Sequence, residues 1–526
     1  MKWSVKCGIL ILIAIAIAIV LRLPQLERRP MHGDEAVHAV KFGLLLEKGF
    51  YQYDPHEYHG PTLNYFTLIP VWLSSTNNFS DIHESTLRIV PVFFGVLLVL
   101  LPLLLIGALG TSATFVIVSL MAISPAMVFY SRYYIQEIML VCFSFGVLVS
   151  GFRYTQSKNF LWALLTGLFL GLMHATKETS MIVIVSMLLA LWLTWITRKQ
   201  QDNLLHPVEV ARGKILWHGI AAIVTAVSVS VLLYSSFFSN IKGILDSYQA
   251  YNIYFDRGTQ NEWHIHPWYY YIKMLIYSKY PQGPPWSEAF IFILAIIGFV
   301  TAMTRKGISG IHIHLIRFIA FYTITVLIIY SLIPYKTPWN LLGFLSGLIL
   351  LAGVGSTTII KFRQKVAARI TVILLLAAGG THLIWQAYLA NYTYSSDPVN
   401  PYVYAHPVKD VVKIAQQVER IAAVHPDGKN MYIQIICPDD DYWPLPWYLR
   451  SFPNIGWWNT IDEDVPNAPL IIASPIVEPA LNKKLYEDPP PGEKHLYLPL
   501  FSSYTELRPG VELRGYVKKD LWDLFE

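Results

Sequence analysis

Charge and cysteine are both scarce in this chain. Only 14% of its 526 residues are charged, whereas 54% are hydrophobic. Soluble globular domains carry about 25% charged residues, so this composition excludes a soluble protein of this size. Two of the three cysteines, Cys7 and Cys142, fall in apolar runs. We therefore expect no intrachain disulfide.

Several sequence motifs are also missing. The chain has no GxGxxG or P-loop glycine pattern, no HExxH zinc pattern and no internal repeat. Their absence argues against a soluble nucleotide-binding enzyme and against a transporter built from two repeated halves. The formal net charge of +5 comes mostly from a few short loops, so no nucleic-acid partner is indicated.

About eleven long apolar runs fill most of the first three quarters of the chain. They cover roughly 8–23, 87–107, 112–130, 137–152, 160–174, 180–197, 215–235, 287–303, 313–333, 338–356 and 370–388. A membrane core of about 30 Å needs about 20 apolar residues per helix, so these runs predict a polytopic helical membrane protein. The first run leads into Leu21-Arg22-Leu23-Pro24 without a small-residue cleavage site. We expect it to be a retained anchor.

Lysine and arginine mark one side of the membrane. If the N-terminus is cytoplasmic, the inner segments hold Lys2, Lys6, Arg153, Lys158, Arg198, Lys199, Arg212, Lys214, Arg305, Lys306, Lys361, Arg363, Lys365 and Arg369. Only Asp202 and Glu209 offset them there. This bias predicts a plasma or inner membrane protein with segments 24–86, 236–286 and everything after residue 389 outside the cytoplasm.

Two regions follow from this pattern. Residues 1–390 are expected to form the membrane domain, and residues 395–526 a small extracytoplasmic α/β domain. In the second region 406–424 has helical periodicity, and 431–437, 469–474 and 494–501 read as strands. Within the first external loop, 35–48 reads as an amphipathic helix capped by Asp34 and ended by Gly49, and 62–75 as a short segment at the membrane surface.

Polar clusters recur at the outer ends of the expected helices. They are His32-Gly33-Asp34-Glu35 with His38, Tyr53–Pro61, Asp81–Glu84 with Arg88, Ser131–Glu137, Thr176–Thr179 and Tyr335–Asn340. All of them fall on the same side of the membrane in the expected topology. Ionisable groups at membrane depth are costly and usually functional, so these clusters are the candidate site.

The carboxylates Asp34 and Glu35 are the first candidates for chemistry. One of them would act as a general base on an acceptor hydroxyl, and the other would orient a sugar or a metal. His38 lies one helical turn from both. The alternative is a plain helix cap, which explains Asp34 but not the flanking histidines.

The histidines of the first loop admit two interpretations. His38, His56, Glu57 and His59 could contact the substrate. The histidines His32, His38, His56, His59 and His83, with nearby carboxylates, could instead hold a divalent cation. Hydrogen bonding within the loop is the better supported alternative, because no tight metal-ligand spacing is present. No cofactor is firmly indicated, and a divalent cation stays possible.

Three cations follow different helices on the outer side. Arg132, Lys177 and Lys336 would bind a phosphate group and stabilise the charge it gains on leaving, with Glu137 and Glu178 beside them. The alternative is that each side chain reaches toward lipid headgroups.

These residues carry a resemblance to a known superfamily. The stretches that carry it are MHGDEAVHA, YDPHEYHGPTLNYF, SRYYIQE, ATKET, IPYKTPWN and YWPLPWYLR. The chain resembles GT-C-fold glycosyltransferases of the protein O-mannosyltransferase, aminoarabinose transferase and RgtA/B/C/D-like group. Within that group it is most similar to the flippase-activity-associated subgroup.

The resemblance implies inverting transfer of a sugar from a polyprenyl-phosphate donor to an extracytoplasmic protein, lipid or glycan acceptor. By position, Asp34 matches the catalytic acidic residue, with Glu35 its partner, and Lys177 a basic residue after the fifth span. Arg132 and Glu137 match a polar pair after the third span, and Lys336 a phosphate contact in a late loop. Glu178 departs from the pattern, because relatives often have a small residue there.

Two questions stay open at this point. A lipid-linked-saccharide flippase or a transporter-associated protein without transferase activity is the main alternative function. In the second region, Pro438-Asp439-Asp440-Asp441-Tyr442-Trp443 reads equally well as a binding surface and as an exposed acidic turn.

Overall fold

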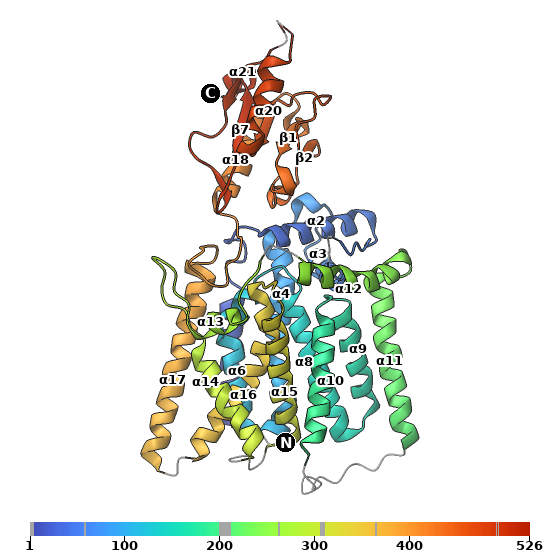
Figure 1. The fold of residues 1–526 in the computed structure, drawn as a ribbon, viewed down its shortest axis with the longest axis vertical. Coiled ribbons are helices and arrows are strands. Elements are labelled where there is room, and N and C mark those ends of the chain that lie inside the picture. The colour runs from blue at the N-terminus through green and yellow to red at the C-terminus, as the bar shows by residue number, and fades with distance from the viewer. Residues whose placement is uncertain are drawn as a thin grey trace.

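The computed structural model describes residues 5–525 apart from 57–58, 199–211, 261–263, 306–310, 363–364, 491 and 493. A bundle of helices carries a small sheet domain at one end, and the N-terminus lies at the opposite end (Figure 1). We call the end that carries the sheet domain the domain-side end. Several residues named above lie outside the described parts, namely Glu57, Lys2, Lys199, Asp202, Glu209, Lys306 and Arg363.

Each of the eleven apolar runs falls on an apolar helix. These helices are α1 (Val5–Arg22), α4 (Glu84–Leu100), α6 (Thr111–Ile123), α8 (Glu137–Ser157), α9 (Phe160–His174), α10 (Ser180–Ile196), α11 (Arg212–Tyr234), α14 (Ala289–Thr304), α15 (Ile313–Leu332), α16 (Leu342–Phe362) and α17 (Val366–Tyr388). Over the described ranges, six helical segments are long and apolar enough to cross a membrane, and five more apolar helices are shorter. The chain is an integral membrane protein, and the expected fold class is confirmed.

Shorter helices form a layer across the domain-side end. They include α2 (Gly33–Lys48), α3 (Thr62–Leu73), α12 (Lys242–Gln260) and α13 (Tyr270–Ile276) (Figure 1). Helix α2 ends at Gly49, as expected, with a left-handed φ of 74°. The prediction that Asp34 caps this helix is wrong. The His32 side chain accepts from the Asp34 N–H and the Glu35 side chain accepts from the His32 N–H, so the helix begins earlier and Asp34 lies within its first turn.

The sheet domain is an α/β unit. Its main sheet has five strands in the order β2 (Ile455–Trp458), β1 (Ile433–Ile436), β3 (Leu470–Ala473), β7 (Arg514–Lys518) and β4 (Tyr497–Pro499). Two short strands, β5 (Glu506–Arg508) and β6 (Val511–Glu512), form a separate sheet. Strand β1 is parallel to β2 and β3, and β7 is antiparallel to β3 and β4. Helices α18 (Asp410–Val424) and α21 (Lys519–Phe525) pack on one face, and α20 (Glu478–Asn482) on the other.

Strands β1, β3 and β4 lie where the sequence predicts them, whereas β2, β5, β6 and β7 were not predicted. Helix α18 begins four residues later than predicted. His406 precedes Pro407, and a residue before proline is kept out of the helical conformation.

The sheet domain contacts the first loop of the membrane domain through α19 (Leu445–Tyr448) and the residues after it. The Met31 amide N–H donates to the Tyr448 hydroxyl at 2.8 Å. Trp447 Nε1 donates to Glu84 at 2.9 Å, and Arg450 donates to the Ile82 carbonyl at 2.7 Å. These three hydrogen bonds fix the domain beside the turn that carries Asp34.

Candidate functional site

Glu35 is the anchor of the turn that precedes α2. Its carboxylate is fully buried and accepts from Arg88 with both oxygens, at 2.8 and 2.7 Å. Arg29 donates to it at 3.2 Å, and the amides of Tyr134 and His32 add bonds of 2.8 and 3.0 Å. Burial alone would raise the pKa of Glu35, but the charges of Arg88 and Arg29 outweigh burial and hold the pKa well below its ordinary value.

Arg88 extends this anchor to the whole loop between α1 and α2. From the first turns of α4 it also donates to the carbonyls of Leu26, Arg29 and Pro30, at 2.6, 2.8 and 3.2 Å. A bidentate arginine–carboxylate pair fixes both distance and orientation. The loop that ends in His32 and Asp34 is therefore held rigidly against the membrane helices.

Asp34 differs from Glu35 in being accessible. Its side chain is 50% exposed, and its nearest basic contact is His32 Nδ1 at 3.9 Å. The negative charge of Asp34 favours the protonated forms of His32 and His38. An exposed carboxylate on a rigid turn is the arrangement a general base needs.

Two ion pairs lie side by side at the ends of α8, α9 and α10. Lys177 donates to Glu137, and both side chains are nearly buried. His59 Nδ1 lies 2.8 Å from Glu178 Oε2, and the Tyr53 hydroxyl donates to the other Glu178 oxygen at 3.0 Å. Burial would raise the pKa of Glu178, but His59 outweighs it and holds the pKa below its ordinary value.

His38 connects Asp34 with these pairs. Its ring lies 6.0 Å from that of His59, and Gln136 lies 3.4 Å from its Nδ1 atom. Burial lowers the pKa of His38 to about 3, with contributions from His59 and Lys177. The ring therefore stays neutral near pH 7. The charges of Asp34 and Lys177 therefore both act on the His38 ring.

Gly60 allows the loop before α3 to approach the turn that carries Lys177. A Cβ atom at residue 60 would stand 2.2 Å from the carbonyl oxygen of Ala175. Thr62 N donates to that same carbonyl at 3.2 Å, and the hydroxyls of Thr62 and Thr176 are 2.9 Å apart. Backbone atoms meet backbone atoms here, so no side chain can move aside.

We expect Gly60→Ala to destabilise the protein by about 1–3 kcal/mol, because the added methyl group overpacks this contact. Thermal unfolding of the purified protein in detergent measures the effect. Gly219→Ala is the matched control, since a Cβ atom there meets nothing within 4 Å. Equal unfolding temperatures for the two variants would contradict the expectation.

His56 and Glu57 are the remaining candidate residues of the first loop. The His56 amide donates to Asp54 at 2.9 Å, and Glu57 lies outside the described residues. Among the residues that the structure describes, no three His, Cys, Asp or Glu side chains are grouped to hold a metal ion. Dependence on a divalent cation stays a prediction.

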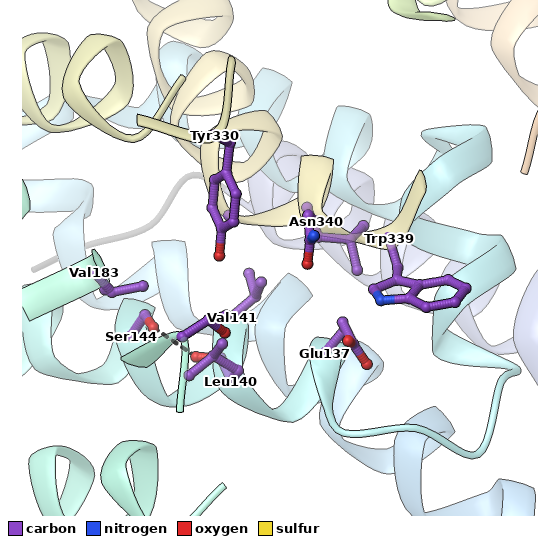
Figure 2. A pocket seen from close by; sticks show the side chains of 11 residues that line it. Glu137, Leu140, Val141, Ser144, Val183, Tyr330, Trp339 and Asn340 are labelled. Atoms are coloured by element: carbon purple, nitrogen blue, oxygen red, sulfur yellow. Dashed lines mark hydrogen bonds between the residues drawn. The ribbon is translucent and has the colours of Figure 1, made fainter. Parts of the chain in front are cut away.

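A small cavity lies beside Glu137, among α8, α10, α15 and η4 (Pro338–Leu341) (Figure 2). Tyr330, Trp339 and Asn340 line it together with Glu137. Its volume of about 20 Å³ is room for about one water molecule. Glu137 Oε2 is buried and has no hydrogen-bond partner among the described residues. A bound polar group would satisfy this atom.

Arg132 and Lys336 are not brought together with Lys177. Arg132 donates to the carbonyls of Arg22, Pro24 and Gln25 at 2.8, 2.8 and 3.2 Å, so its guanidinium binds the C-terminal end of α1. The Lys336 ammonium is buried and donates to the carbonyls of His266 and Ile333. Their roles at a phosphate stay predictions without a contact to support them.

Trp339 is the site residue whose contribution the sequence analysis passed over. It lines the Glu137 cavity, and its ring lies 6.2 Å from His32, 6.0 Å from Tyr133 and 6.0 Å from Tyr404. The His32 Nε2 atom lies 2.9 Å from the Tyr404 carbonyl. The sequence signal for this residue was that Pro338 and Trp339 follow Lys336 at the outer end of a span.

The structure combines a helical bundle, a polar site at one end of it and a small sheet domain above that end. Residues 64–240 match the family described as dolichyl-phosphate-mannose-protein mannosyltransferase. A comparison with curated proteins found no significant match.

Solved structures share this architecture along nearly the whole chain. ArnT from Cupriavidus metallidurans in the apo state is 14% identical with a TM-score of 0.64, over 97% of this chain and 98% of that one. ArnT from the same organism bound to undecaprenyl phosphate is 14% identical with a TM-score of 0.62, over 97% of this chain and 98% of that one. The archaeal oligosaccharyltransferase AglB from Archaeoglobus fulgidus, in complex with an inhibitory peptide and a dolichol-phosphate, is 13% identical with a TM-score of 0.56, over 89% and 69%. The expected GT-C resemblance is confirmed, whereas the flippase-activity-associated subgroup stays a prediction.

Proposed function

We propose that this protein is an integral-membrane glycosyltransferase that moves a sugar from a polyprenyl-phosphate donor to an acceptor hydroxyl, with inversion at the anomeric carbon. The observation that carries the proposal is the half-exposed Asp34 carboxylate on a turn fixed by the buried Glu35–Arg88 pair. Lys177, whose charge acts together with that of Asp34 on the His38 ring, supplies positive charge for a phosphate.

The comparisons support a lipid-linked donor. One structure of similar fold binds undecaprenyl phosphate and another binds dolichol-phosphate. A donor anchored in the membrane by its isoprenoid chain reaches a site at the ends of helices without a nucleotide cradle. This agrees with the absence of nucleotide-binding glycine patterns from the sequence.

The proposed step is a single displacement. The Asp34 carboxylate removes the proton from the acceptor hydroxyl while that oxygen bonds to the anomeric carbon. The bond between this carbon and the phosphate oxygen breaks, and the electron pair leaves with the polyprenyl phosphate. The products are an inverted glycoside, the free lipid phosphate and a protonated Asp34, which then releases its proton to water.

Glu35 has a different role in this proposal from the one the resemblance implies. Five donors from Arg88, Arg29 and two backbone amides surround its oxygens, so it has no free lone pair directed at a substrate. We assign it as the residue that positions Asp34. Glu137 and Glu178 likewise hold Lys177 and His59 in place.

The domain-side end faces away from the cytoplasm in this proposal. The loops rich in lysine and arginine then lie in the cytoplasm, in agreement with the positive-inside rule. Donor, acceptor and sheet domain meet at the extracytoplasmic surface.

The test uses the full-length protein in lipid with a panel of polyprenyl-phosphate sugars. Release of free polyprenyl phosphate, with transfer of the sugar to an acceptor or to water, is the expected result. The alternative function, a lipid-linked-saccharide flippase, would move the labelled donor across the bilayer without releasing its sugar. That outcome, unchanged by Asp34→Asn, would overturn the proposal.

Lys177→Met should lower kcat/KM for the donor by about 10–150-fold, the value of a hydrogen bond to a charged group. Among the described residues Glu137 is the one hydrogen-bond acceptor of Lys177, so two N–H groups remain for a phosphate. Lys177→Arg keeps the charge and should retain more activity. Lys48→Met, at the exposed end of α2, is the control. Equal kcat/KM for Lys177→Met and Lys48→Met would remove Lys177 from the donor site.

A further inference from the structure

The turn after β1 lies where the sheet domain meets the membrane domain. Tyr442 packs against the hydrophobic core of the sheet domain, whereas Trp443 packs against the core of the membrane domain. The Trp443 Cβ atom is 3.7 Å from the position that a Cβ on Gly33 would occupy. Gly33 directly precedes Asp34, so Trp443 lies beside the turn that carries the proposed catalytic carboxylate.

This turn combines aromatic rings with unpaired carboxylates. Tyr442 and Trp443 are both partly exposed, with ring centroids 6.1 Å apart, and Trp457 lies 4.8 Å from Tyr442. Asp441 is paired with Arg508, whereas the exposed Asp439 and Asp440 have no ion pair within the described parts of the chain. The Tyr442 hydroxyl donates to Asp440 at 3.1 Å, which orients that carboxylate beside the ring.

We infer that Tyr442, Trp443, Asp439 and Asp440 form the acceptor subsite of the enzyme, and that its ligand is a neutral carbohydrate. This inference rests on the proposed function. The C–H face of a sugar ring packs on the electron-rich face of an aromatic ring, and its hydroxyl groups donate to carboxylates. A ring held on Trp443 brings the neighbouring hydroxyl groups to Asp34.

The charge of the turn selects against other acceptors. Asp34, Asp439 and Asp440 add negative charge on the proposed acceptor side, which disfavours anionic lipid acceptors and acidic peptides, whereas the donor phosphate is proposed to bind at Lys177. A neutral glycan meets no such cost and has many hydroxyl donors for the three carboxylates. The distribution of charge therefore favours a neutral glycan over an anionic lipid or an acidic peptide.

The test measures binding without any donor, so that it is independent of transfer. Full-length protein in detergent is titrated with soluble neutral oligosaccharides, namely fragments of glucan, mannan and chitin, by calorimetry. We expect saturable binding of at least one of them to the wild type. Trp443→Ala should weaken it at least about tenfold, the effect of truncating an aromatic anchor.

Two further variants separate binding from folding. Asp439→Asn removes one charge and should weaken binding severalfold. Its left-handed φ of 58° suits asparagine, so the turn is retained. Tyr504→Ala removes a tyrosine that is 63% exposed elsewhere in the sheet domain and should leave binding unchanged.

Three outcomes would overturn the inference. One is wild-type affinity in both Trp443→Ala and Asp439→Asn. Another is loss of binding in Tyr504→Ala as large as in Trp443→Ala. The third is no saturable binding of any neutral oligosaccharide, including the case in which an acidic peptide or an anionic lipid binds instead. If donor turnover fails while Trp443-dependent sugar binding persists, the proposed function is wrong but the carbohydrate site stands.

Discussion

Replacing Asp34 by asparagine should reduce sugar transfer by about 10²–10⁴-fold, the usual contribution of a general base. The side chain keeps its size and its place in the first turn of α2, so the fold should be unaffected. The variant should still bind donor, because Lys177 and Glu137 are unchanged. Release of polyprenyl phosphate from a labelled donor measures the loss, and the thermal unfolding temperature verifies the fold.

A matched control is available on the same side of the membrane. Asp81→Asn changes an exposed carboxylate in the short turn before α4, at which no ligand is proposed. It should keep full transfer activity. Turnover by Asp34→Asn equal to that of Asp81→Asn would exclude Asp34 as the base.

Arg88→Met should destabilise the protein by about 3–5 kcal/mol, because it leaves the carboxylate of Glu35 buried without its main partner. Both Arg88 and Glu35 are almost completely excluded from solvent. Unfolding in detergent, followed by circular dichroism, measures the loss. The loop of residues 26–31 should also loosen, since Arg88 binds three of its carbonyls.

A double-mutant cycle identifies the source of this loss. Glu35→Gln removes the charge that Arg88 pairs with, so the combined variant should lose much less than the sum of the single losses. Arg28→Met, which removes an exposed arginine of the same loop, is the control for loss of a basic side chain. A loss of stability in Arg88→Met no greater than in Arg28→Met would show that Arg88 does not anchor this loop.

The helices were predictable because each is a long apolar segment, and length and composition are local properties of the sequence. The gathering of polar clusters at one end followed from the same topology. The roles within the clusters were not predictable. Glu35 and Arg88 are 53 residues apart, and nothing local indicates that Arg88 binds Glu35 or that Arg132 binds the end of α1.

The predicted cap of α2 was wrong, and strands β2 and β7 were missed, for local reasons. Aspartate is the commoner capping residue, but the pairing of His32 with Glu35 places the helix start before Asp34. Strand β2 has only four residues, all half-buried, so it lacks the alternation that marks a strand. Strand β7 includes Gly515 and begins and ends with the charged Arg514 and Lys518, which weakens its strand pattern.

The hydrogen bonds from Trp447, Tyr448 and Arg450 also bear on chimeric enzymes. These residues bind Glu84, Met31 and Ile82, which lie in the first loop and at the start of α4. A sheet domain transplanted from a relative would lose these partners unless residues 31–35 and 82–84 were exchanged with it. Residues 31–35, residues 82–84 and the sheet domain therefore need to be exchanged together. We expect chimeras that exchange all three to fold, and chimeras that replace only the chain after residue 409 to fail.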